Sequence, residues 1–197
     1  MTTTARPDQP HEQPTATRRE PLADESPATL RGLYTAHMRD VWHTLRRLGV
    51  QHRDLEDATH EVFLIAFRRW ETFEPDRSGR AWLVGIAWRV AAGERRRSRN
   101  RMVNLGFERE LGDHDAPDAE QLTEAAQDRA LVHAVLATLP DDQRDVFVLH
   151  ELDGLSMPEV SAAVDAPLNT LYSRLRLARK KFKSEVLRLR GPQEVRP

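Results

Sequence analysis

The chain has 197 residues, of which 39% are hydrophobic and 31% charged, so it is long enough for one larger domain or two small ones. Its mean hydropathy of -0.64 excludes a membrane-spanning protein, and the absence of cysteine excludes disulfides, thiolate catalysis and cysteine-containing zinc sites. The amino-terminal residues contain no apolar stretch typical of a secretory signal, and we therefore expect a cytoplasmic protein without membrane insertion.

Charges are segregated along the chain, although the net charge is only -1. Residues 89–101 carry six arginines and one glutamate, and residues 174–190 carry eight Lys or Arg and one glutamate. Between these basic blocks, residues 108–128 carry eight acids and one arginine. This order suits two modules that face nucleic acid and are joined by a solvated linker.

The first predicted segment is a tail over residues 1–27. It contains five prolines and no aromatic residue, and it is rich in Thr, Glu and Gln. Such a composition cannot bury enough apolar surface to offset the entropy that is lost on ordering. We therefore expect this tail to be disordered.

Two helices are predicted after the tail. Apolar residues recur at helical spacing over residues 30–48, and Gly49 is typical of a helix end. A second helix begins near Asp54 and has two apolar stripes, one of which consists of Phe63, Phe67 and Trp70. A helix that is apolar over two surfaces is expected to pack with one of them and to dock a partner with the other.

A turn over residues 73–80 leads into a third helix, which begins near Ala81 and runs into the arginine cluster. Trp88 projects about 150 degrees away from the core side of this helix, in line with Arg95 and Arg99. Such a surface can stack on unpaired bases while its cations hold the backbone of a single strand. The alternative interpretation is that Trp88 packs on the second bundle or on the tail.

A linker is predicted over residues 102–123, where acids, glycines and a proline interrupt any periodicity. Helices resume near Glu124 and again after Asp141, and no strand pattern occurs in the sequence. The sequence therefore predicts an all-α fold with two small helical bundles, over residues 28–101 and 124–190.

The second bundle ends in a predicted helix-turn-helix. The segment Ser156–Glu159 has the spacing of a capping box, and the short helix that it begins ends by Val164. A tight connector over residues 165–168 follows, after which Asn169 or Thr170 can cap a longer basic helix. Short helix, tight turn and basic helix together form the arrangement whose second helix enters the major groove of DNA.

The basic helix is predicted to have two different faces. Its core face consists of Leu171, Leu175, Ala178, Phe182 and Leu189. Its outward row, which suits contacts to base edges, consists of Asn169, Ser173, Arg176 and Lys180. Side chains that flank the row at angles suited to phosphates are Arg174, Arg179 and Lys181. The alternative is a solvated basic face on an ordinary surface helix.

These segments resemble a known family. The run LEDATHEVFL at 55–64 and the run AWLVGIA at 81–87, with arginines after it, resemble region 2 of bacterial sigma-70 factors. The residues 139–160 and 169–179 resemble region 4, and the order and spacing resemble the small extracytoplasmic-function (ECF) group. The resemblance implies a sigma factor that binds core RNA polymerase and promoter DNA, melts the minus-ten element and reads the minus-thirty-five element.

The resemblance also assigns site residues. Docking on the clamp helices of the largest polymerase subunit is expected of Asp57, His60, Glu61, Phe63 and Phe67. Minus-ten contacts are expected of Arg77, Arg80, Trp88, Arg89, Arg95, Arg96 and Arg99. Minus-thirty-five contacts are expected of Asn169, Thr170, Tyr172, Ser173, Arg174, Arg176, Arg179 and Lys180. The polymerase flap and an anti-sigma factor are the further partners that the resemblance implies.

Two other classes of protein were weighed. An enzyme has little support, because Leu64 stands where the zinc-protease motif that His60 and Glu61 begin needs a second histidine, and no G-x-G phosphate loop occurs. We therefore expect no catalytic residue, metal, cofactor or small-molecule substrate. A helix-turn-helix regulator that acts without polymerase would need only the second bundle, and the docking stripe of the first bundle argues against it.

Overall fold

The computed structural model describes residues 29–74, 78–105 and 124–190. Over these segments the fold consists of seven α-helices joined by short helical turns, with no strand, which confirms the all-α fold class predicted from the sequence. The predicted tail, most of the predicted linker and the predicted DNA contact Arg77 lie outside the described residues. None of the described helices is long and apolar enough to cross a lipid bilayer.

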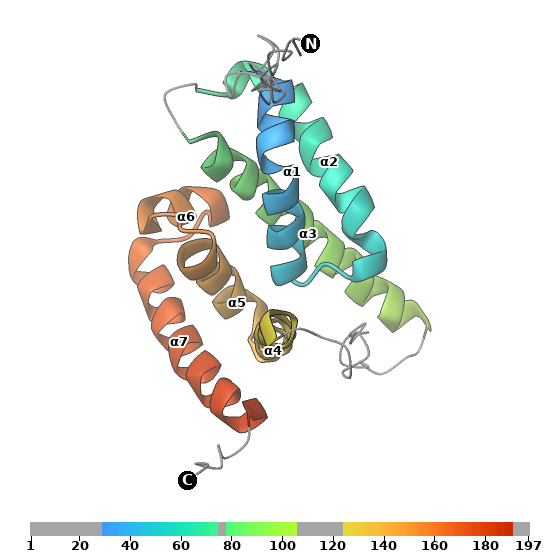
Figure 1. Ribbon diagram of the computed structural model, residues 1–197. Coiled ribbons are helices and arrows are strands. Elements are labelled where there is room, and N and C mark those ends of the chain that lie inside the picture. The colour runs from blue at the N-terminus through green and yellow to red at the C-terminus, as the bar shows by residue number, and fades with distance from the viewer. Residues whose placement is uncertain (1–28, 75–77, 106–123, 191–197) are drawn as a thin grey trace, which may run out of the picture.

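The first bundle consists of α1 (Leu30–Arg47), α2 (Leu55–Arg68) and α3 (Gly79–Leu105), with the turns η2 (His52–Asp54) and η3 (Trp70–Thr72) (Figure 1). Each of the three helices packs against the other two. Thr29 caps α1, since its Oγ1 accepts a hydrogen bond from the N–H of Gly32 at 3.0 Å. After α1, Gly49 adopts a φ of +89°, which glycine tolerates without strain.

Helix α3 is longer than the sequence predicted. It runs on to Leu105, beyond the predicted boundary of the bundle at residue 101. No glycine or proline interrupts the sequence between Gly93 and Gly106, so the helix has no local reason to end at the arginine cluster.

The second bundle consists of α4 (Glu124–Thr138), α5 (Asp141–Phe147), the π-helical turn η4 (Val148–Leu152), α6 (Met157–Val164) and α7 (Leu168–Arg190). Helix α7 crosses α4, α5 and α6, and α6 with α7 forms the helix-turn-helix (Figure 1). The predicted capping box is present: the N–H of Ser156 donates to Glu159 Oε2 at 2.7 Å, and the N–H of Glu159 donates to Ser156 Oγ at 3.4 Å.

The predicted cap of the basic helix is wrong. Helix α7 begins at Leu168, so Asn169 and Thr170 lie inside its first turn, and the N–H of Leu171 donates to the carbonyl of Pro167 at 3.1 Å. The chain turns earlier than the polar side chains suggested, because Asp165 ends α6 in the left-handed conformation with a φ of +52°.

The two bundles pack directly on each other, and their buried apolar side chains form one continuous cluster. Helix α3 of the first bundle lies against α6 of the second, where Gly85 faces Ala163 (Figure 1). Arg144 of α5 places its guanidinium group beside Gly49 at the end of α1. The contact between the bundles therefore determines which surfaces of each one face solvent.

Candidate DNA-binding and polymerase-binding surfaces

Helix α7 presents the predicted row of base contacts to solvent. Leu171, Leu175 and Ala178 are buried against the second bundle, as the helical spacing predicted, whereas Leu189, which was also predicted for the core face, is 40% exposed. On the other side of the helix, the exposed residues are Asn169, Thr170, Tyr172, Ser173, Arg176 and Lys180. This row combines amide, hydroxyl and guanidinium groups, which are the side chains that recognise base edges in a major groove.

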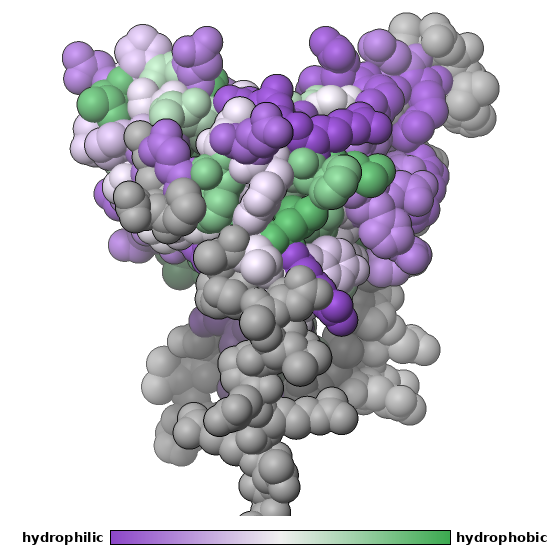
Figure 2. Space-filling model, turned by 90° about the horizontal axis from the view of Figure 1, so that it is seen from above, coloured by the Kyte–Doolittle hydropathy of each residue, from purple (hydrophilic) through white to green (hydrophobic). Residues whose placement is uncertain are grey.

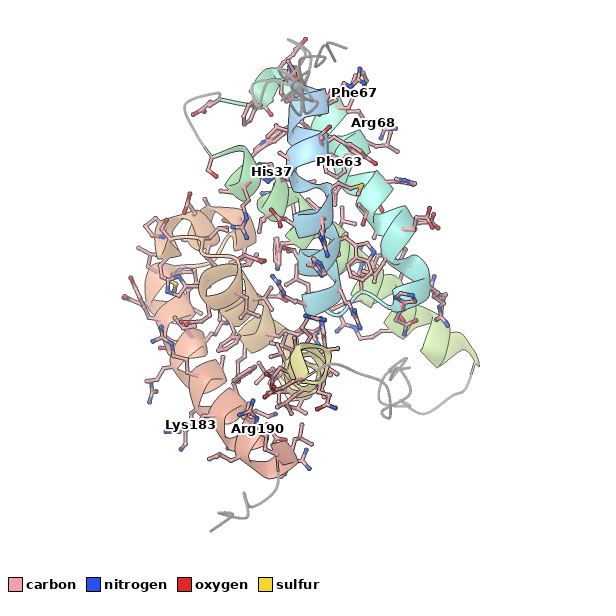
Figure 3. All side chains as sticks on the ribbon, viewed as in Figure 1. His37, Phe63, Phe67, Arg68, Lys183 and Arg190 are labelled. Atoms are coloured by element: carbon pink, nitrogen blue, oxygen red, sulfur yellow. The ribbon has the colours of Figure 1, made fainter. Side chains whose placement is uncertain are left out.

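Two predicted phosphate contacts beside this row are already in ion pairs. Arg174 Nε lies 3.1 Å from Asp142 Oδ2, and Arg179 Nε donates to Glu151 Oε1 at 2.9 Å. The side chains of Arg174 and Arg179 are 34% and 57% exposed. Exposed ion pairs of this kind contribute only about 0–1 kcal/mol, so both guanidinium groups can exchange a carboxylate for a phosphate. Further along α7, Lys183 and Arg190 extend the basic surface (Figure 3).

The first bundle carries an exposed apolar surface on α1 and α2. We call the residues Tyr34, Met38, Leu64 and Phe67 the α1–α2 patch; their side chains are large and exposed, Phe67 at 66%. In Figure 3, Phe67 projects from the end of α2 that lies away from the second bundle. From that end of the molecule, hydrophobic side chains gather in the middle of the face and hydrophilic ones border them (Figure 2). An apolar surface rimmed by polar groups is typical of a protein-binding site.

Of the five predicted polymerase contacts, four are exposed or half-exposed and the fifth, Phe63, is buried. Asp57 and His60 are exposed, and Glu61 is half-exposed with its Oε2 3.3 Å from Arg97 Nη2. Phe63 is only 8% exposed, and its ring meets the ring of Tyr34 at 4.7 Å. Phe63 therefore supports the patch from below. Tyr34, Met38 and Leu64 are not among the predicted contacts, although their apolar character at outward helical positions is a usable signal.

The predicted single-strand surface of α3 faces the second bundle. Trp88 Nε1 donates to Asp145 Oδ2 at 2.7 Å, and Arg95 Nη2 donates to the same oxygen at 2.8 Å. Arg99 Nη1 donates to Asp141 Oδ2 at 2.7 Å. The arrangement matches the alternative interpretation of Trp88, in which the indole packs on the second bundle. A cleft of about 240 Å³ lies between α3 and these acids.

A third acid of the second bundle is held in the same way. The carboxylate of Asp153, which follows η4, is fully buried; Thr44 Oγ1 donates to its Oδ2 at 2.9 Å, and Arg47 Nη1 donates to its Oδ1 at 2.7 Å. Arg80 Nη2 lies 3.6 Å from the same Oδ1, and Arg80 Nη1 donates to the carbonyl of Asp153. Arg80, another predicted minus-ten contact, is thus also turned towards the second bundle.

Burial shifts the pKa values of these acids. Burial raises the pKa of Asp145, although Arg95 and Trp88 act in the opposite direction, and burial raises the pKa of Asp153 against Arg47 and Thr44. At Asp141 burial also favours a higher pKa, but the nearby arginines outweigh it and hold the pKa below its usual value. For Asp145 and Asp153, desolvation of the carboxylate therefore raises the pKa by more than the neighbouring donors lower it.

The remaining predicted minus-ten contacts differ from this group. Arg89 and Arg96 are exposed on α3 and belong to no hydrogen bond or ion pair described here. No local pattern indicates a role for Asp141, Asp145 and Asp153, because their partners in the first bundle lie far away along the chain. No group of three or more metal-binding side chains occurs in the described part of the chain.

Comparison with known proteins places these surfaces in a family. The family model "Sigma-70 region 2" matches residues 33–101, and "Sigma-70, region 4" matches residues 129–182. The RNA polymerase sigma factor CnrH of Cupriavidus metallidurans is 31% identical over 145 residues, which cover 70% of this chain and 75% of CnrH. The ECF RNA polymerase sigma-E factor of Escherichia coli (strain K12) is 31% identical over 148 residues, which cover 68% of this chain and 74% of that protein.

Solved structures agree on the fold. The sigma factor RpoE of Bartonella quintana, in complex with the anti-sigma factor NepR, matches with a TM-score of 0.63 and 20% identity, over 83% of this chain and 98% of RpoE. CnrH in complex with the cytosolic domain of CnrY matches with a TM-score of 0.57 and 24% identity, over 79% of this chain and 85% of CnrH. Because regions 2 and 4 both match in order, a regulator with only the second bundle is not favoured. The chain belongs to the sigma-70 family, in its ECF group, and is a sigma factor that directs the initiation of transcription.

Proposed function

We propose that this sigma factor docks on core RNA polymerase through α2, reads the minus-thirty-five element with α7 and holds the opened minus-ten strand on α3, in the cytoplasm. The observation that carries the proposal is the exposed row of polar side chains on α7. This helix is the second helix of a capped helix-turn-helix, and its opposite, apolar face is buried against the second bundle. This role requires no catalytic residue, because sigma factors are non-catalytic initiation factors.

The α1–α2 patch supports polymerase docking. Its exposed aromatic and aliphatic side chains can supply affinity, and the acids beside it on α2, Asp57 and Glu61, can orient the partner. Phe67 projects from the end of α2 that lies away from the second bundle, so a polymerase subunit can reach it while the bundles stay in contact (Figure 3).

The DNA contacts are assigned by side-chain chemistry. On α7, Arg176 and Ser173 of the exposed row discriminate bases, whereas Lys180, Lys181 and Lys183 supply salt-dependent affinity for the backbone. On α3, Arg89 and Arg96 meet the DNA first, and Trp88, Arg95 and Arg99 join them when the second bundle moves away. Arg77, which lies outside the described residues, is a further proposed contact of the minus-ten strand.

An anti-sigma factor is the second proposed protein partner. Two solved relatives are complexes, RpoE with the anti-sigma factor NepR and CnrH with the cytosolic domain of CnrY. A large exposed apolar surface such as the α1–α2 patch favours a regulatory partner that covers this surface when the protein is not bound to polymerase. Affinity capture of the chain from its native cell extract tests this partner.

The test of the proposed function is reconstitution with core polymerase. The full chain is mixed with purified core enzyme, the complex is isolated by gel filtration, and promoters are selected from a pool of random duplexes. We expect a stable complex that enriches one bipartite promoter class. A chain that enriches duplex DNA alone and forms no complex with core enzyme would support the regulator alternative instead.

A further inference from the structure

Two apolar residues at the start of α7 face solvent beside the exposed row. Leu168 is 40% exposed and Tyr172 is 55% exposed. We propose that Leu168 and Tyr172 recognise thymines of the minus-thirty-five element by contact with the C5-methyl groups of these bases. The proposal rests on the proposed role of α7 in reading duplex DNA.

Both residues belong to the part of α7 that reaches base edges. Leu168 is the first residue of the helix and follows the turn that begins at Asp165. In a helix-turn-helix, the residues at the amino end of the second helix contact the base edges. Residues four positions apart are neighbours on one face of a helix, so Leu168 and Tyr172 form a pair, and the exposed Asn169 lies beside it.

The beginning of α7 also differs in charge from the rest of the helix. Residues 168–173 contain no acidic or basic side chain, whereas residues 174–190 contain eight Lys or Arg and one glutamate. Phosphates are bound mainly by cations, so the neutral beginning of the helix is less suited to the DNA backbone. An amide, hydroxyl groups and two apolar side chains are exposed there, and these are groups that distinguish base edges.

Thymine is the base that offers an apolar group in the major groove. Its C5-methyl group projects into the groove, whereas the characteristic groups of the other bases are hydrogen-bond donors and acceptors. A leucine side chain cannot form a hydrogen bond with those groups. Contact between a methyl group and a leucine side chain or a tyrosine ring removes apolar surface from water on both sides, and this favours binding.

The spacing of the pair suits two thymines that lie close together. Four residues of α-helix rise by about 6 Å, and successive base pairs of B-DNA are about 3.4 Å apart. Leu168 and Tyr172 can therefore contact methyl groups within two base-pair steps of each other. The amide of Asn169 is of the kind that binds adenine, the partner of thymine in the same base pair. The beginning of α7 is therefore suited to a short run of A·T pairs.

Packing within the protein does not account for the two exposed side chains. Helix α7 joins the buried apolar cluster through Leu171, Leu175 and Ala178, and neither Leu168 nor Tyr172 belongs to this cluster. The hydroxyl group of Tyr172 forms no hydrogen bond within the part of the chain that the structure describes. We therefore expect alanine at either position to leave the melting temperature unchanged, so that a defect in these variants reports on binding.

Uracil substitution tests the methyl contacts, because uracil is thymine without the C5-methyl group. The full chain is assembled with core polymerase, and one thymine at a time is replaced by uracil in the minus-thirty-five element of a promoter that this holoenzyme selects. We expect binding to weaken about fourfold at each of two thymines within two base-pair steps. A selected element without two such thymines, or equal affinity for the thymine and uracil promoters, would overturn the proposal.

Protein variants then connect each residue with one methyl group. Leu168→Ala and Tyr172→Ala should each lose the response to uracil at one position and keep it at the other. Tyr172→Phe keeps the ring and should keep both responses. The matched control is Leu187→Ala, which removes a leucine that is 65% exposed near the other end of α7 and should respond like the wild-type chain. Wild-type responses in both Leu168→Ala and Tyr172→Ala would contradict the assignment.

The same assay separates this proposal from a failure of the proposed function. If the wild-type chain forms no complex with core polymerase or selects no promoter, the proposed function fails and the methyl contacts fail with it. If the complex forms and selects a promoter but shows no response to uracil, the methyl contacts alone fail. If Leu168→Ala and Tyr172→Ala weaken assembly with core polymerase and keep both uracil responses, the pair is a protein contact and the proposal is wrong.

Discussion

Arg176 lies within the exposed row of α7, and its chemistry gives the first prediction. A guanidinium group can donate two hydrogen bonds to one guanine, and the loss of such a contact costs about 1–3 kcal/mol of discrimination. Arg176→Ala should therefore change the preferred upstream sequence in a selection from random duplexes. Lys183→Ala is the control: it should weaken binding to all sequences alike and reduce the salt dependence of the affinity. An unchanged preference in Arg176→Ala would leave Arg176 as a phosphate contact.

The two phenylalanines of α2 give a second prediction, because their exposures differ although both belong to the predicted docking stripe. Phe67 is 66% exposed and Phe63 is 8% exposed. Phe67→Ala should weaken binding to core polymerase and leave the melting temperature unchanged. Phe63→Ala should destabilise the fold by about 3–5 kcal/mol, because it leaves a cavity beneath the patch. Binding titration and thermal unfolding separate the two effects, and equal melting temperatures for both variants would contradict the assignment.

For single residues, the sequence predicted the side of the helix on which a side chain lies better than it predicted the residues that the side chain contacts. Helical spacing correctly placed Leu171 and Leu175 in the core and Ser173 and Arg176 outside it. The same arithmetic turned Trp88 away from the core of its own bundle. Its hydrogen-bond partner Asp145 lies 57 residues further along the chain, and no local pattern indicates a contact over that distance.

Helix α6 depends on its capping box, and this gives a third prediction. Hydrogen bonds from the hydroxyl and the backbone N–H of Ser156 lower the pKa of Glu159. A carboxylate whose pKa is lowered by folding stabilises the folded state above its ordinary pKa, and this contribution is lost as the pH falls through the lower, folded value. Ser156→Ala should destabilise the chain by about 1 kcal/mol at neutral pH.

Urea unfolding at neutral and at acidic pH measures this effect. The difference between wild type and Ser156→Ala should shrink as Glu159 becomes protonated. Ser184→Ala is the control, because its hydroxyl donates to the carbonyl of Lys181 on the exposed side of α7 and caps no helix. A difference that stays constant with pH would show that the cap acts without the carboxylate.

The existence of the α-helices followed from the sequence, whereas the end of α3 and the start of α7 did not. Every helix that the apolar spacing predicted is present over the described residues. The start of α7 was misjudged because Asp165 takes a left-handed conformation that its sequence permits but does not require. The π-helical turn η4 was not predicted either, since a widened turn depends on the packing around it.

At the scale of the molecule, the charge pattern was informative but incomplete. Two basic blocks correctly indicated two modules of a nucleic-acid-binding protein, and the family comparison agrees. The pattern did not show that the first basic block faces the acids Asp141 and Asp145 of α5 when the bundles meet. Those acids lie outside the acidic block of residues 108–128, and only the packing of α3 on α6 brings them to Trp88 and Arg95.

The contact between the bundles gives the last prediction, because Trp88 has two separable parts. Its N–H donates to Asp145 Oδ2 at 2.7 Å across the contact between the bundles, while its ring is the part that can stack on an unpaired base. Trp88→Phe removes the hydrogen bond and keeps an aromatic ring, whereas Trp88→Ala removes both. Both variants should therefore loosen the contact between the bundles.

Only Trp88→Ala should slow the opening of duplex promoters, which permanganate footprinting of the melted region measures. On a template with a pre-opened bubble, the defect of Trp88→Ala should shrink, because the strands of this template are already separated. Trp88→Phe should open duplex promoters at least as fast as the wild-type chain, since it keeps the stacking ring and has lost a hydrogen bond to the second bundle. If both variants fail equally on duplex and bubble templates and no longer bind core polymerase, Trp88 acts only as a packing residue between the bundles.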